Sequence, residues 1–346
     1  MHLFELKLLS KILHNKLPYI CFCGIGEGVS VLHRYIGHSP HVFRGDCGPV
    51  AHTSRNSYNS DGADVFNAEM KSVLVGDIEI SNDLSIVFIG GPCAIESQEH
   101  CIFMEKSIKS ICNKLNIAYI FKSSFDKANR SSVVGKRGVG IEEGLKILTE
   151  VKRQVGVPVL TDVHLPEQCS RVAEVADVLQ IPAFLCRQTD LLASAAKTGR
   201  AINVKKGQFV APNDMKGVVA KLEHFGAKNI MLCERGACFG YNNLIVDMRG
   251  LPIMAKTGYP VIFDATHSVQ LPSANGECSG GEREFAPFLA RAAVAVGVAG
   301  IFMEVHDNPE AAPCDGANMV RLKDLEQILT ELLTLDKISK RCVRRI

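Results

Sequence analysis

The segment Pro260–Glu304 shows the pattern that decides the fold. It opens with the apolar run PVIFD (Pro260–Asp264), passes through an amphipathic helical candidate at Arg283–Val296 and ends with a second apolar run, GIFME (Gly300–Glu304). Apolar runs of this length are typical of strands that are buried on both faces, and such strands form parallel sheets. Six more runs of this kind lie upstream: Ser85–Gly90, Ala118–Lys122, Pro158–Asp162, Val178–Ile181, Ala201–Lys205 and Asn229–Glu234.

Helical candidates lie between these runs or follow the last one. Besides Arg283–Val296, they include Glu142–Gln154, Asp214–Phe225 and Leu322–Leu335. Eight strand–helix units predict a closed (β/α)8 TIM barrel. An earlier stretch, Val73–Ile80 (VLVGDIEI), alternates apolar and polar residues and predicts a short hairpin at the bottom of the barrel. An open doubly wound sheet is the alternative, but no G-x-G-x-x-G motif opens the first helix.

The residues before Met70 differ from the rest of the chain. They mix short apolar pieces with turn-rich polar sequence such as HTSRNSYNSDGAD, and no helical or strand period persists. We expect residues 1–69 to be a poorly ordered or artefactual extension, and residues 70–346 to form the catalytic barrel. The alternative is an added interaction module.

Composition excludes several classes of protein. The 346 residues carry a net charge of +2, so the basic excess of a nucleic-acid coat or a polybasic membrane binder is missing. No apolar run reaches the roughly 18 residues of a membrane span. The 13 cysteines are scattered and odd in number, which favours reduced thiols in a cytoplasmic protein over a disulfide framework.

The apolar runs share a second property, because polar residues stand at or just after their ends. In a barrel these positions gather at the carboxyl-terminal rim, where barrel enzymes carry out their chemistry. The residues are Cys93, Lys122, Asp162, His164, Gln180, Lys205, Glu234, Arg235, Asp264, His267, Glu304 and His306.

Phe121–Ser132 (FKSSFDKANRSS) is the most specific of these segments. It places Lys122, Lys127 and Arg130 beside an amide and several hydroxyls, a combination that can hold phosphate or carboxylate groups. Further cations follow other runs, at Lys205 and Arg235. A solvated basic face is the alternative, but lysines that end apolar strands favour an anion-binding pocket.

Six segments together resemble the 3-deoxy-D-manno-octulosonate 8-phosphate (KDO-8-phosphate) synthases. The resemblance runs from about Met70 almost to the C-terminus. The related DAHP synthases share the barrel and the GPC element, but carry a K-P-R-T-S type segment where this chain has KANRS (Lys127–Ser131). The six segments are FKSSFDKANRSS, GPCAIES (Gly91–Ser97), IPAFLCRQTDLL (Ile181–Leu192), NVKKGQF (Asn203–Phe209), ERGACFGYNNLIVD (Glu234–Asp247) and DATHSVQLP (Asp264–Pro272).

The resemblance implies a reaction in which phosphoenolpyruvate, D-arabinose 5-phosphate and water give KDO 8-phosphate and phosphate, for lipopolysaccharide biosynthesis. The two substrates bring about five negative charges, which suits the cations of the sequence. By similarity, Lys122, Lys127, Gln180, Lys205 and Arg235 would bind phosphoenolpyruvate. The sugar phosphate would be held by Asn129, Arg130, Ser131, Asp162 and Arg187, the last from a neighbouring subunit of a homotetramer.

The resemblance also implies a divalent metal, because metal-using members carry Cys in the GPC element and metal-free members carry Asn there. The ligands would be Cys93, His267, Glu304 and Asp315, and Zn, Fe(II) or Mn would suit them. The segment Asp315–Met319 (DGANM) matches neither the metal-using nor the metal-free pattern. The candidate catalytic groups are Lys127, Asp264 and His267.

Two other functions remain open from the sequence. One is a DAHP synthase that uses erythrose 4-phosphate, which shares the chemistry. The other is a non-catalytic barrel that binds a sugar phosphate or a metal as a sensor.

Overall fold

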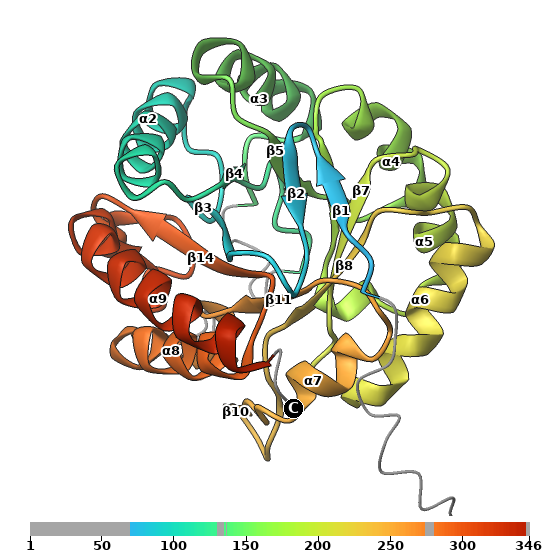
Figure 1. Cartoon of the computed structure of the whole chain (residues 1–346). Helices are drawn as coiled ribbons and strands as arrows, with labels where there is room; N and C mark the ends of the chain where they lie inside the picture. Colours follow the sequence, from blue (N-terminus) through green and yellow to red (C-terminus); the bar gives the residue numbers. More distant parts are fainter. Residues whose placement is uncertain (1–69, 130–134, 136, 274–279, 344–346) are drawn as a thin grey trace, which may run out of the picture. The chain divides into compact units, whose positions relative to one another are not determined.

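Eight parallel strands close into a barrel in the computed structural model, which describes residues 70–129, 135, 137–273 and 280–343. Neighbours in the chain pair in sequence order, and β11 pairs with both β8 and β14, which closes the ring. The predicted TIM barrel is confirmed (Figure 1). The barrel strands are β3 (Val87–Gly91), β4 (Tyr119–Lys122), β5 (Val159–Asp162), β6 (Val178–Ile181), β7 (Ala201–Lys205), β8 (Ile230–Glu234), β11 (Val261–Asp264) and β14 (Gly300–His306).

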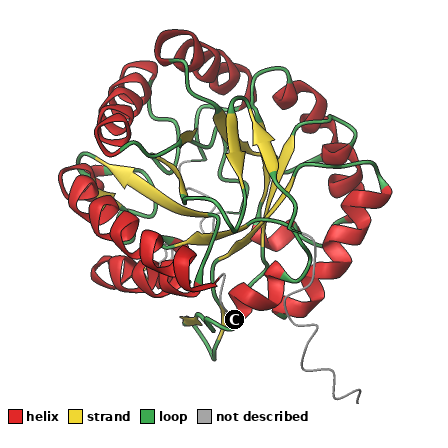
Figure 2. Cartoon of the chain, viewed as in Figure 1, coloured by secondary structure: helices red, strands yellow, loops and turns green. Residues whose placement is uncertain are grey.

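Helices surround the strands as an outer ring, as Figure 2 shows. Three of the four predicted helices agree with the structure within two residues at their first residue, and α9 continues beyond its predicted end. The fourth, α8, begins later than predicted because Arg283–Phe285 form a 3-10 turn and Pro287 starts the α-helix. The α-helices are α2 (Gln98–Leu115), α3 (Ile141–Val155), α4 (Pro166–Ala173), α5 (Thr189–Ala196), α6 (Met215–His224), α7 (Gly250–Ala255), α8 (Ala286–Val296) and α9 (Leu322–Val343).

A two-stranded hairpin, β1 (Val73–Val75) and β2 (Ile78–Ile80), covers the amino-terminal end of the barrel. Its turn uses Gly76 at φ 59°, a conformation that glycine adopts without strain. Val73, Val75 and Ile80 are buried with the first interior residues of the strands in one apolar cluster. The predicted hairpin is therefore present, and it seals the end of the barrel opposite the polar strand ends.

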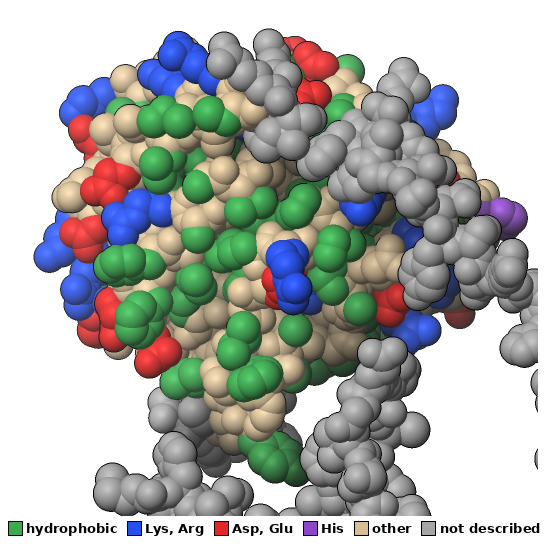
Figure 3. Space-filling model, turned by 60° about the horizontal axis from the view of Figure 1, so that its bottom comes forward, with side chains coloured by type: hydrophobic (Ala, Val, Ile, Leu, Met, Phe, Trp, Pro, Cys, Tyr) green, Lys and Arg blue, Asp and Glu red, His purple; other side chains and the backbone are tan. Residues whose placement is uncertain are grey.

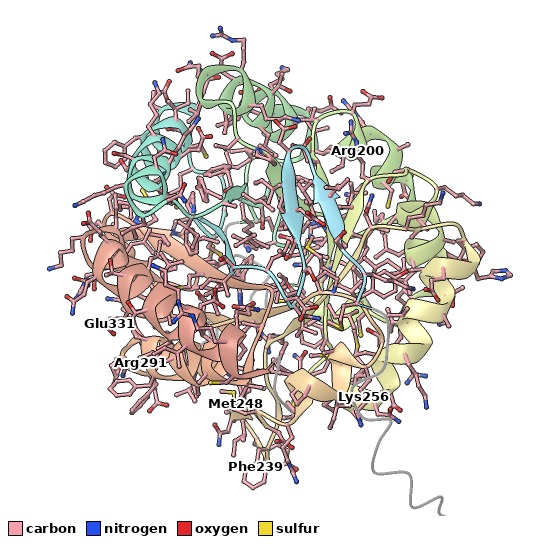
Figure 4. All side chains as sticks on the ribbon, viewed as in Figure 1. Arg200, Phe239, Met248, Lys256, Arg291 and Glu331 are labelled. Carbon is pink, nitrogen blue, oxygen red and sulfur yellow. The ribbon has the colours of Figure 1, made fainter. Side chains whose placement is uncertain are left out.

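The loops contain short paired strands. They are β9 (Ala237–Cys238) with β10 (Leu244–Ile245), β12 (Gln270–Leu271) with β13 (Gly280–Gly281), and β15 (Val320–Arg321), which pairs in parallel with the end of β14. Phe239, at the tip beyond β9, is 67% exposed and projects from the edge of the molecule in Figure 4. In the same view Arg291 of α8 meets Glu331 of α9, with their nitrogen and oxygen 3.0 Å apart.

The outer surface is mixed in chemistry. On the face in Figure 3, hydrophobic side chains form small patches between polar atoms, and many charged side chains lie toward the edge. Among the described helices, none is long and apolar enough to cross a membrane. The predicted extension, residues 1–69, lies outside the described residues, so its boundary stays a prediction.

Candidate active site

A cavity of about 270 Å³ opens at the carboxyl-terminal ends of the barrel strands. That volume is slightly below the usual range for small-molecule pockets. Most of its polar lining comes from strand ends, as expected for a barrel enzyme. The structure thus brings together eleven of the residues singled out in the sequence. They are Lys122, Lys127, Asn129, Asp162, His164, Gln180, Lys205, Arg235, Asp264, His267 and Asp315.

The first ion pair at the cavity joins Lys122 and Glu304, which are 1% and 0% exposed. The Lys122 Nζ lies 2.8 Å from Glu304 Oε1 and 3.1 Å from the carbonyl oxygen of Cys93. Lys127 lies further out, with its Nζ 3.8 Å from the same carboxylate oxygen. Burial opposes ionisation of Glu304, but the attraction of Lys122, His267 and Lys127 outweighs it and lowers the pKa of Glu304 to about 2.

A second buried pair joins Lys205 and Asp264. The Lys205 Nζ donates to Asp264 Oδ2 and also lies 3.3 Å from the centre of the Phe302 ring. The same carboxylate accepts the backbone N–H of His267 at 2.9 Å and faces its ring Nδ1 at 2.8 Å. Burial would raise the pKa of Asp264, but His267 and Lys205 lower it well below its usual range. The carboxylate thus favours a proton on Nδ1 and leaves Nε2 of His267 free as an acceptor.

These pairs add detail to the expected anion-binding pocket. In the structure, carboxylates already neutralise Lys122 and Lys205, so the pocket is stable before any substrate enters.

Arg235 differs from the lysines. Its backbone N–H and that of Gly236 both donate to Glu234 Oε1, at 3.0 and 2.7 Å, and this fixes the turn after β8. Its Nη2 donates to Gln270 Oε1 at 3.0 Å, whereas its buried Nη1 has no hydrogen-bond partner among the described residues. Burial lowers the pKa of Arg235, yet guanidinium remains charged near neutral pH. A buried cation with an open donor is suited to bind an oxyanion.

Asp162 belongs to a hydrogen-bonded chain at the ends of β5, β6 and β7. Its Oδ1 accepts from Gln180 Nε2 at 2.6 Å, and Gln180 Oε1 accepts from Asn203 Nδ2 at 2.9 Å. The Ser124 hydroxyl donates to Asp162 Oδ2. Burial would raise the pKa of Asp162, but Lys122 and Lys127 keep it well below its usual range, so this carboxylate is an acceptor.

The four predicted metal ligands form two groups that share Asp315. Cys93 lies with Asp315, the thiol Sγ being 3.1 Å from Oδ2. His267 and Glu304 form the other group with Asp315, and within each group the donor atoms lie within 4.8 Å of one another. Glu304 Oε2 is buried and has no hydrogen-bond partner in the described part of the chain. A thiol, an imidazole and two carboxylates, one with an orphaned oxygen, therefore fit a divalent metal.

Comparison with known proteins identifies the family. The family model of the DAHP synthetase I family matches residues 59–341. The chain belongs to the DAHP synthetase I family. Curated relatives carry the name 2-dehydro-3-deoxyphosphooctonate aldolase, another name for KDO-8-phosphate synthase, so the predicted resemblance is confirmed.

Two of these relatives come from Rickettsia. The protein of Rickettsia bellii (strain OSU 85-389) is 58% identical over 270 residues, which cover 78% of this chain and 98% of the relative. The protein of Rickettsia prowazekii (strain Madrid E) is 57% identical over 273 residues, which cover 79% of this chain and 99% of the relative.

Not every residue predicted from the resemblance reaches the cavity of this DAHP synthetase family member. Asn129 lines the cavity and is exposed. Arg187 is exposed and is not among the cavity-lining residues of the single chain; its carbonyl oxygen accepts from Lys221 Nζ at 3.0 Å. Arg130 and Ser131 lie outside the described residues, so their predicted contacts stay predictions.

Sequence reasoning missed two residues of the site. Gln270 connects the anion-binding Arg235 with the predicted metal ligand Asp315. Its Oε1 accepts from Arg235, and its Nε2 donates to Asp315 Oδ1 at 3.0 Å. It stands inside the quoted motif DATHSVQLP, which was a signal that could have been used. Cys314 lies 2.6 Å from Cys93, sulfur to sulfur, and only its position before Asp315 pointed to it.

A further group, Glu96, His100 and His306, could also hold a metal by the positions of its donor atoms. Its hydrogen bonds favour a supporting role. His306 Nδ1 accepts the Asn308 backbone N–H at 2.9 Å, so Nε2 carries the proton that it shares with Glu96 at 2.7 Å. This histidine therefore ties the end of β14 to the loop before α2.

Proposed function

We propose that this chain is a KDO-8-phosphate synthase. It forms a bond between C3 of phosphoenolpyruvate and the aldehyde carbon of D-arabinose 5-phosphate, water adds at C2, and cleavage of the C2–O bond releases phosphate. The observation that carries the proposal is the match to aldolases of this name along 98% of their length at 58% identity. The cavity supports it, because buried cations lie at the strand ends.

Arg235 binds the phosphate of phosphoenolpyruvate through Nη1, the donor without a partner. Lys205 ends the neighbouring strand β7, pairs with Asp264 and adds positive charge beside Arg235. Lys122 and Lys127, with Gln180, face the carboxylate end of the substrate. Fixed donors on rigid strand ends hold the substrate without reorganisation during the reaction.

The sugar phosphate enters from the outer side of the cavity. Asp162 accepts sugar hydroxyls, since Lys122 and Lys127 keep it ionised. Asn129, Arg130 and Ser131 hold the phosphate group. Arg187 adds a cation from a neighbouring subunit of a homotetramer, which accounts for its exposure in the single chain.

His267 and Asp264 are the groups through which a proton would move. Asp264 holds the proton of the His267 ring on Nδ1, and this hydrogen-bonded pair is the proposed route, because Nε2 of His267 would bind the metal. Lys127, whose side chain is 15% exposed, supplies positive charge at the mouth of the cavity.

Cys93, His267, Glu304 and Asp315 hold a divalent metal in this proposal. A metal there supplies electrophilic polarisation of the sugar aldehyde. The orphaned Glu304 Oε2 and the sulfur of Cys93 support this assignment. Zn, Fe(II) and Mn all suit the four ligands, and the place of action is the cytoplasm, in lipopolysaccharide biosynthesis.

The test is phosphate release from phosphoenolpyruvate with each of two aldehydes. We expect rapid release with D-arabinose 5-phosphate, with an eight-carbon product, and little with erythrose 4-phosphate. A preference for erythrose 4-phosphate would make the chain a DAHP synthase. Binding of both ligands without turnover would make it a sensor. Light scattering of the full chain measures the subunit number and so tests the tetramer. For the shared site, the KM for the sugar phosphate is compared between the wild type and Arg187→Ala, and light scattering of the variant shows whether the tetramer is kept.

A further inference from the structure

Cys314 lies at the metal ligands, although nothing in the sequence assigned it a role. It is 5% exposed, and its Sγ lies 2.6 Å from that of Cys93. Cys93, Cys314 and Asp315 each offer one donor atom, and these three atoms all lie within 4.8 Å of one another.

Hydrogen bonds link the three donor atoms. The Cys314 thiol donates to Cys93, and the Cys93 thiol donates to Asp315 Oδ2 at 3.1 Å. Two protons thus hold three electron-rich atoms together. A metal binds only deprotonated thiols, so a cation can take the place of both protons and serve the same three atoms.

The backbone turns both neighbouring side chains toward Cys93. Asp315 has φ 49°, a left-handed conformation that costs a non-glycine residue about 1–2 kcal/mol. Gly316 follows, and a Cβ there would come within 2.2 Å of the Pro309 carbonyl oxygen, so the turn is tight. The strained backbone at Asp315 thus directs the side chains of Cys314 and Asp315 toward the sulfur of Cys93.

We propose that Cys314 donates a second thiolate to the metal centre and so makes the centre prefer Zn²⁺ over Mn²⁺. Thiolates are soft ligands that select zinc, whereas carboxylate-rich sites suit manganese. This inference rests on the proposed metal site, and it narrows the choice among the metals that four ligands leave open.

X-ray absorption of the zinc-loaded wild-type protein tests the proposal directly. Zinc–sulfur bonds are about 2.3 Å long, and the spectrum counts them. Two sulfur ligands per zinc are expected. One sulfur would overturn the role of Cys314 and leave the proposed four-ligand site intact, and none would overturn that site as well.

Cobalt substitution under anaerobic, reducing conditions gives a second readout. The near-ultraviolet charge-transfer band of Co²⁺ scales with the number of thiolate ligands. We expect Cys314→Ser and Cys93→Ser each to lose about half of the band. Cys112→Ser, which alters a buried thiol of α2, is the matched control and should keep all of it.

Metal selectivity completes the test. In Cys314→Ser the ratio of Zn²⁺ to Mn²⁺ affinity should fall at least tenfold. A full cobalt band and an unchanged ratio in this variant would overturn the proposal.

Discussion

Replacing Arg235 with methionine tests the anion site at its most specific point. The guanidinium is 6% exposed, donates through Nη2 to Gln270, and keeps Nη1 without a partner among the described residues. Methionine has a similar length but no donor and no charge. The backbone N–H groups bound by Glu234 stay in place, so the turn after β8 should persist.

The expected loss follows from that one open donor. A hydrogen bond to a charged group contributes about 1.5–3 kcal/mol. Its removal should therefore weaken the affinity for phosphoenolpyruvate about 10- to 150-fold. Arg235→Lys keeps the charge but lacks the planar fork, and its loss should be smaller.

Initial rates of phosphate release measure this loss, with phosphoenolpyruvate varied at saturating D-arabinose 5-phosphate. We expect KM for phosphoenolpyruvate to rise and KM for the sugar phosphate to change little. Arg171→Met is the control, since this exposed arginine pairs with Glu142 on the outer ring. An unchanged KM for phosphoenolpyruvate, or an equal rise in both constants, would refute the assignment.

Three further predictions concern other parts of the molecule. The Glu105 carboxylate is buried and has no hydrogen-bond partner within the described ranges, and burial raises its pKa to about 8. The folded state therefore keeps a proton that the unfolded state releases above about pH 4.5. The stability of the wild type should fall between pH 4.5 and 8, and Glu105→Gln should raise Tm at pH 8 but hardly at pH 4.5; parallel Tm curves would contradict this. Cys93→Asn should lose tight metal binding, and stoichiometric metal in the purified variant would show that the ligand set is wrong. A chain that begins at Met70 should fold and turn over normally, and an insoluble or inactive product would show that residues 1–69 matter.

Most of the barrel could be predicted because burial on both faces leaves a direct record in the sequence. Runs such as Pro260–Asp264 are apolar up to their last residue, and this one became strand β11, in which every residue is buried. The start of α8 was wrong by three residues, because a 3-10 turn has nearly the same side-chain period as the first turn of an α-helix.

The strand ends of the site could also be predicted, since topology alone places them at one rim. Which lysine would pair with which carboxylate could not be predicted. Lys122 on β4 meets Glu304 on β14, and Lys205 on β7 meets Asp264 on β11, in each case across one intervening strand. Side chains from alternate strands fill one layer of a barrel, so partners lie two strands apart and not on neighbouring strands.

Two residues that reach the site from loops, Cys314 and Gln270, were missed. The dipeptide Asp315-Gly316 marks a turn, but it does not show that the left-handed backbone at Asp315 directs Cys314 toward Cys93. Gln270 joins Arg235 to Asp315 through both ends of its amide, a contact set by the path of the loop after β11.

The ion pairs have a consequence for the order of binding. Glu304 neutralises Lys122 and attracts Lys127, so both lysines are poorly available to a substrate carboxylate while Glu304 is ionised and free. A divalent metal on Glu304 and Asp315 would neutralise the charge of these carboxylates. The positive charges of Lys122 and Lys127 would then be available to attract the carboxylate of phosphoenolpyruvate. Metal and phosphoenolpyruvate should then bind cooperatively, and linkage requires that each increases the affinity for the other by the same factor.

Calorimetry can measure this coupling, with phosphoenolpyruvate titrated into metal-free and metal-loaded protein, and metal titrated with and without phosphoenolpyruvate. We expect a gain of about 5- to 150-fold, the range typical of coupled sites. Glu304→Gln should bring the metal-free affinity for phosphoenolpyruvate close to that of the loaded wild type, because it frees Lys122 without any metal. Equal affinity in metal-free and loaded wild type would mean that the lysines are available throughout, and that the carboxylates serve the metal alone.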